Sequence, residues 1–230
     1  MPIPKLKIVR LWRLWRLLYK HCLGHNKCLL SLLAVTMIPA WLLLSCSTAP
    51  PTHMDNSCDI FKEKRGWYPQ ARRSARRWGV SIGTQLAIIH QESKFKSEAK
   101  SPRTHILWII PWTRRSTAYG YAQVVDNTWD WYRRDTGNRH ADRDDFDDAV
   151  DFVGWYVYTS SKLLHIPKQD AFRHYLAFHE GHGGYQKKTY RKKPWLIKAA
   201  RKVAMRAKRY DRQLKSCEKE LRRYRWWWPF

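Results

Sequence analysis

The sequence lacks several patterns that mark common protein classes. No segment repeats at a fixed period, which excludes a repeat architecture. The stretch HEGH at residues 179–182 places its histidines three residues apart, whereas a zinc-protease helix needs them four apart. The acidic stretch DRDDFDD at 142–148 has neither the loop glycine nor the distal glutamate of a calcium-binding loop. We therefore expect no metal and no cofactor.

Acidic residues are also scarce. The 230-residue chain has 19 Asp and Glu against 44 Lys and Arg, a formal net charge of +25. Such a balance alone would favour a nucleic-acid partner. The compartment decides which polyanions the protein meets, so the amino-terminal segment has to be interpreted first.

Residues 1–27 hold seven basic residues and no acid, and an apolar run follows at 28–44. A basic region followed by an apolar run is the pattern of an export signal. The run is near the lower length limit for crossing a bilayer, and Pro39 interrupts it. An uncleaved signal anchor is the alternative interpretation.

The apolar run ends in LLSC, and this junction resembles a bacterial lipobox. The resemblance implies a lipoprotein signal peptide at 1–45 and an acylated Cys46 as the first mature residue. Ser47, which is not an aspartate, favours sorting to the periplasmic side of the outer membrane. There the polyanions are wall polymers, lipopolysaccharide and anionic lipids, so nucleic acid is not an expected partner.

The five cysteines fit an exported protein. Cys22 and Cys28 belong to the predicted signal, Cys46 takes the lipid, and Cys58 and Cys217 remain. An even pair in an oxidising compartment suggests a disulfide. Two unpaired thiols are the alternative.

Apolar periodicity predicts a mainly helical domain. Residues 46–65, small and polar at first, are interpreted as a flexible tether, and 218–230 as a basic and aromatic tail. Residues 101–116 are expected to form a loop or short hairpin with an apolar tip, packed in the core or placed beside a cleft. The expected helices cover 68–79, a segment from Gly83 or Thr84 to Ser93, a segment within 142–157, 170–181 with Asp170 as its cap, and 194 to about 217.

Three short motifs occur in order: Glu92-Ser93, AYGYAQ at 118–123, and AFHEGHGGY at 177–185. Together they resemble the lytic transglycosylases of the soluble lytic murein transglycosylase superfamily. The resemblance covers 66–217 and implies a lysozyme-like, mainly α fold. It departs from the usual pattern at His179, where asparagine is usual, and at the pair before Gln123.

Glu92 is the predicted catalytic acid. On a helix, Ile88 and Ile89 share its face, so its carboxyl is expected to be desolvated and its pKa raised. A carboxyl still protonated near neutral pH can donate to a glycosidic oxygen.

The resemblance implies cleavage of peptidoglycan between MurNAc and GlcNAc without a second carboxylate and without water, which leaves 1,6-anhydroMurNAc ends. Glu180 is the best candidate for a second acid. A hydrolytic muramidase and a non-catalytic wall-binding lipoprotein are the alternatives. Protein partners are not predicted. The remaining site residues are expected to hold the saccharide or the local backbone (Ser93, Gly120, Gln123), to line the cleft or pack in the core (Tyr119, Phe178, His179, Glu180, Tyr185), or to hydrogen-bond the acid (Tyr190).

Overall fold

The computed structural model describes residues 49–101, 103–106, 110–114 and 116–223. The predicted signal peptide, Cys46 and the stretch from 224 to 230 lie outside the described residues. The described residues form one compact unit. Its elements are α3 (Ser57–Glu63), α4 (Trp67–Trp78), α5 (Ile82–Ser93), β1 (Arg103–Ile106), β2 (Ile110–Arg114), α6 (Asp126–Thr136), α7 (Phe146–Leu164), α8 (Ala171–Gln186), a 3₁₀ turn η1 (Thr189–Lys192) and α9 (Pro194–Arg223).

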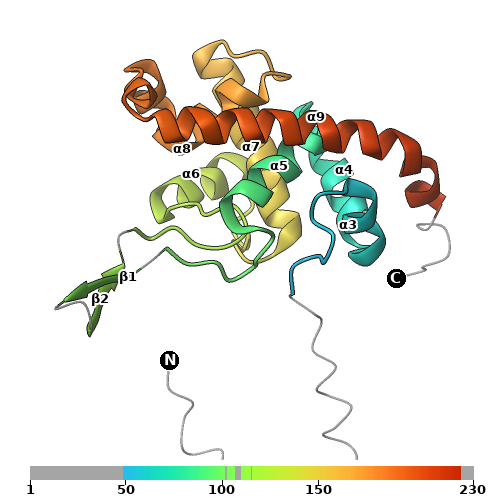
Figure 1. The fold of residues 1–230 in the computed structure, drawn as a ribbon, viewed down its shortest axis with the longest axis horizontal. Helices are drawn as coiled ribbons and strands as arrows, with labels where there is room; N and C mark the ends of the chain where they lie inside the picture. Colours follow the sequence, from blue (N-terminus) through green and yellow to red (C-terminus); the bar gives the residue numbers. More distant parts are fainter. Residues whose placement is uncertain (1–48, 102, 107–109, 115, 224–230) are drawn as a thin grey trace, which may run out of the picture. The chain divides into compact units, whose positions relative to one another are not determined.

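Helix α5 lies at the centre of this unit and packs against α9, α7 and α4 (Figure 1). Every residue from Ile82 to His90 is buried. A helix that is apolar on all sides belongs inside a core rather than at its surface. Ser81 caps α5, since its side chain accepts from the Thr84 amide. The predicted caps Gly83 and Thr84 lie one turn too late.

The longest helix, α9, crosses the whole unit (Figure 1). Its buried residues recur at alternating intervals of four and three, the spacing that keeps one face toward a core. They are Leu196, Ala200, Val203, Ala207, Tyr210, Leu214, Cys217 and Leu221. The structure describes α9 as far as Arg223, so the predicted tail at 218–230 begins too early.

A disulfide joins Cys58 on α3 to Cys217 on α9, as one of the two interpretations of the cysteines predicted. Helix α3 buries Ile60 and Phe61. The predicted tether at 46–65 is therefore too long, because a helix of the folded unit occupies its second half.

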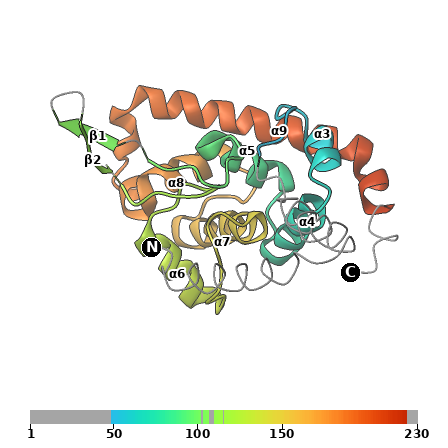
Figure 2. The same ribbon diagram turned by 90° about the horizontal axis from the view of Figure 1, so that it is seen from below.

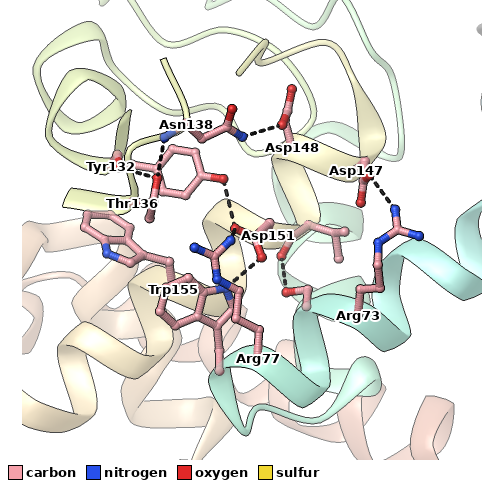
Figure 3. Close-up of polar contacts among 12 residues, drawn as sticks. Arg73, Arg77, Tyr132, Thr136, Asn138, Asp147, Asp148, Asp151 and Trp155 are labelled. Atoms are coloured by element: carbon pink, nitrogen blue, oxygen red, sulfur yellow. Dashed lines mark hydrogen bonds and ion pairs between the residues drawn. The ribbon is translucent and has the colours of Figure 1, made fainter. Parts of the chain in front are cut away.

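Helices α4 and α7 are held together by polar contacts around Asp151 (Figure 3). Its carboxylate accepts from Arg77 at 3.1 Å, from the Trp78 indole at 2.8 Å and from the Tyr132 hydroxyl at 3.0 Å. The two helices approach closely at Gly154, where a Cβ would lie 2.5 Å from the Ser74 hydroxyl. Asp151 therefore acts as a structural group that joins α7 to α4.

Strands β1 and β2 pair antiparallel and extend beyond the helices in both views (Figures 1 and 2). The predicted hairpin at 101–116 is confirmed at the level of the backbone. Of its predicted apolar tip, Leu107, Trp108 and Ile109 lie outside the described residues, while Ile106 ends β1 and Ile110 and Trp112 lie on β2.

Candidate active site

Glu92 lies in the last turn of α5, one turn after the fully buried Ile88 and Ile89. Directly after it, Lys94 and Phe95 both adopt left-handed backbone conformations that turn the chain away from the helix axis. The Glu92 residue is partly accessible, yet its Oε1 atom is buried and has no hydrogen-bond partner among the described residues. A buried, unpaired carboxyl oxygen favours the neutral form of the acid.

Burial raises the pKa of Glu92 to about 7, and a hydrogen bond from Tyr175 opposes that rise. Near neutral pH, half of such a group is protonated and half ionised. It can therefore donate a proton in one step and accept one in the next.

Tyr175 comes from the first half of α8 and is 3% exposed. Burial and the neighbouring Glu92 raise the pKa of its hydroxyl, so the phenol remains the donor. The resemblance assigned such a contact to Tyr190, which stacks on Tyr185 with ring centroids 5.4 Å apart. The tyrosine that hydrogen-bonds Glu92 in this structure is Tyr175, and a contact from Tyr190 stays a prediction.

Gln123 braces the backbone next to the end of α5. Its amide donates to the Ala99 carbonyl at 2.8 Å and to the Gly120 carbonyl at 2.9 Å. Gly120 has φ +80°, and a Cβ there would lie 2.0 Å from the Arg143 carbonyl oxygen. Only glycine fits this approach. The second motif thus shapes the loop with its polar groups turned to the backbone.

Tyr119 and Ser93 are also engaged within the protein. The Tyr119 hydroxyl donates to Asp144 at 2.7 Å, and burial and that carboxylate raise its pKa to about 12. The Ser93 hydroxyl donates to the Ile89 carbonyl at 3.3 Å. Their predicted contacts with saccharide stay predictions.

The third motif lies in the second half of α8, where Gly181 has a non-helical backbone (φ +71°, ψ 164°) and divides α8 into two helical segments, so the predicted helix stop at Gly181 is confirmed. Phe178 packs edge-on against Phe152 and Tyr156 and contributes to the core. The His179 imidazole lies 5.1 Å from the Trp195 ring. Phe178 therefore packs toward α7, and His179 packs toward the start of α9.

Glu180 is fixed by three partners. Its side chain is 3% exposed and contacts Lys193 at 2.7 Å, His179 at 3.1 Å and the Thr189 hydroxyl. Burial alone would raise the pKa of Glu180, but the hydrogen bonds from Lys193, Thr189 and His179 lower it to about 2. A carboxylate held ionised in this way is a structural group and a poor proton donor.

The model of the transglycosylase SLT domain matches residues 34–217, most of the chain. The chain belongs to the transglycosylase SLT domain family. A comparison with curated proteins finds no significant match. SLT membership agrees with the mostly helical fold and supports lytic transglycosylase activity on peptidoglycan glycan strands.

Two other places in this SLT domain were candidates for a functional site: a metal-binding cluster and a surface hollow. Among the described residues no group of three or more His, Cys, Asp or Glu is placed to hold a metal. A hollow of about 620 Å³ opens beside Ser81 and Thr84, at the opposite end of α5 from Glu92. Eleven helical residues separate Ser81 from Glu92, about 16 Å along the axis, so the two sites are distinct.

The hydrogen bond from Tyr175 gives a testable pH dependence. Glu92 must be protonated to donate, so activity should fall as pH rises through about 7. Tyr175→Phe removes the group that lowers this pKa, so the alkaline limb of kcat should move to higher pH. Loss of positioning should also reduce kcat about 10-fold. Rates measured from pH 5 to 9 check both effects.

Tyr158→Phe is the matched control, because Tyr158 is a half-buried tyrosine on α7 that contacts Lys168 and not Glu92. Its alkaline limb should coincide with that of the unaltered protein. An unshifted limb in Tyr175→Phe would contradict the role of Tyr175.

Proposed function

We propose that this SLT domain cleaves the β-1,4 bond between MurNAc and GlcNAc without water and leaves 1,6-anhydroMurNAc ends. The observation that carries the proposal is the solitary character of the acid. Burial and Tyr175 account for the pKa of Glu92, and within the described part of the chain no second carboxylate contributes. In a retaining glycosidase the two carboxyl groups are about 5 Å apart, close enough to perturb each other.

One carboxyl group would serve twice. Glu92 donates its proton to the glycosidic oxygen as the C1–O bond breaks, and the acetamido oxygen of MurNAc bonds to C1. The ionised Glu92 then takes the proton of the C6 hydroxyl. O6 bonds to C1, the acetamido oxygen leaves, and Glu92 is again protonated. A pKa of about 7 suits both steps.

A hydrolytic muramidase with a second carboxylate would use that group as the base for water. The best candidate, Glu180, has three partners and a pKa of about 2, which makes it too weak a base to activate water efficiently. This observation disfavours hydrolysis with Glu180 as the base.

The reaction can be read from its product. Purified glycan strands digested by the protein should release muropeptides one water lighter than those from a hydrolytic muramidase run in parallel. These ends should also resist borohydride reduction, because the anhydro ring has no free aldehyde. Reducible ends would indicate hydrolysis, and intact strands would indicate a binding protein.

We also propose that the domain acts outside the cytoplasm, attached through lipid at Cys46 to the periplasmic side of the outer membrane. The LLSC junction and the preceding apolar run support this location. The cysteine pair bonded across the folded unit is consistent with an oxidising compartment. No helix within the described part of the chain has the length and apolar character needed to span a membrane.

A further inference from the structure

One face of α9 carries a straight line of cations. Exposed residues recur there at alternating intervals of three and four, in the same rhythm as the buried face but on the opposite side of the helix. From Lys198 to Lys219 they cover 22 residues, about 32 Å of helix. The cationic stripe consists of Lys198, Arg201, Lys208, Arg212, Lys215 and Lys219, with the exposed Met205 at its middle.

The stripe is not neutralised within the described part of the protein, where none of its six cations has an ion pair. The acids of α9 point elsewhere. Asp211 accepts from the Gly83 amide at 2.8 Å, Glu218 binds Tyr68 and Arg222, and Glu220 pairs with Lys62. Like charges one turn apart repel each other, and an external anionic surface would offset that repulsion.

Apolar groups accompany the charge. Met205 is 64% exposed in the middle of the stripe. Beyond Arg223, the last residue of α9 that the structure describes, the sequence contains Trp226, Trp227 and Trp228. A basic helix face next to tryptophans is typical of segments that bind at the interface of a bilayer, whereas a polyanionic polymer needs only the charge.

Helix α9 also contacts the segment that leads toward the predicted anchor. Asp55 pairs with Arg209 at 2.6 Å, and the Cys58–Cys217 bridge lies three residues further along the chain. Helix α3 packs against α9, and Figure 1 shows it beside that helix. Twelve residues separate Cys46 from Cys58, which limits their distance to about 40 Å. A bilayer holding the anchor is therefore within reach of the stripe.

We propose that the cationic stripe of α9, with the tryptophans that follow it, binds the anionic headgroup surface of a lipid bilayer. A single lipid chain anchors a protein only marginally, and a polybasic patch supplies the second attachment. The stripe would lay the long axis of α9 along the membrane.

The test uses residues 48–230, which have their own core and disulfide, so that the apolar amino-terminal segment contributes nothing. The probes are phosphatidylcholine vesicles with and without phosphatidylglycerol. Binding should require phosphatidylglycerol and weaken as salt is added. Lys208→Glu, Arg212→Glu and Lys215→Glu together should weaken binding roughly 100-fold or more, given the contribution of each cation near such a surface.

The matched control reverses three exposed cations on other helices, Arg76→Glu, Arg134→Glu and Lys162→Glu. It carries the same net charge and should bind nearly as well as the unaltered protein, and both variants should melt normally. Equal binding by the two variants would overturn the proposal. So would stripe-dependent adsorption to purified peptidoglycan without binding to vesicles, which would assign the stripe to a wall polymer.

A third variant isolates the aromatic contribution. Replacing Trp226, Trp227 and Trp228 with alanine leaves the charge unchanged and should weaken vesicle binding at every salt concentration. Unaltered binding would overturn the part of the proposal that assigns the tryptophans to the membrane-binding surface.

Discussion

Glu92→Gln is expected to abolish glycan cleavage and to lower kcat/KM by at least about 1,000-fold. The amide has no acidic proton that it could transfer to the leaving oxygen. The substitution preserves the shape of the side chain and can still accept from the Tyr175 hydroxyl. Substrate adsorption should therefore be retained. Release of soluble muropeptides measures the loss, and sedimentation with insoluble peptidoglycan measures the adsorption.

The same variant should be more stable than the unaltered protein at high pH. A carboxyl with a pKa of about 7 in the folded state and 4.5 in the unfolded state favours folding below pH 4.5, and this contribution is lost as pH rises through 7. Removing the ionisable group should avoid a penalty of up to ~3 kcal/mol at pH 9. Melting curves at pH 5 and pH 9 give the comparison.

Glu98→Gln is the matched control, since Glu98 is exposed and lies six residues after Glu92 in the following loop. It should retain activity and show no gain in stability at pH 9. Substantial cleavage by Glu92→Gln would remove Glu92 from its role, and the assignment of the reaction with it.

The environment of Glu92 could be predicted because its cause is local. Two isoleucines one turn before Glu92 predict desolvation, and the structure buries its Oε1 atom and raises its pKa accordingly. Its partner could not be predicted in this way. Tyr175 is 83 residues further along the chain and meets Glu92 because α8 and α5 both pack against α7 and α9.

Helices with a wide apolar face were predicted nearly to their ends. The starts of α7 and α8 follow from Asp145 and Asp170, whose side chains accept from amides of the first turn. Helix α6 was missed, because it buries only Trp129 and Tyr132 and offers no apolar period. Its stop at Gly137, which is left-handed, was the available signal.

The largest stability effect should come from the bridge between Cys58 and Cys217. Both cysteines are nearly buried, at 8% and 6% exposed, and they lie 159 residues apart in sequence. Closing a loop of that length restricts the unfolded chain by ~5 kcal/mol in the loop-entropy description. Reduction, or replacement of both cysteines with alanine, should lower Tm by roughly 10–20 °C for a domain of this size.

Two features separate the bridge from ordinary core packing. Each single alanine variant should lose nearly as much stability as the double variant, since either one alone opens the loop. The urea m-value should rise when the bridge is removed, because the unfolded chain expands. The double variant is the control for the reductant and should melt at the same temperature with or without it. Free alkylation of both thiols in the unreduced protein would show that the loop is open, and then neither the fall in Tm nor the rise in m-value should appear.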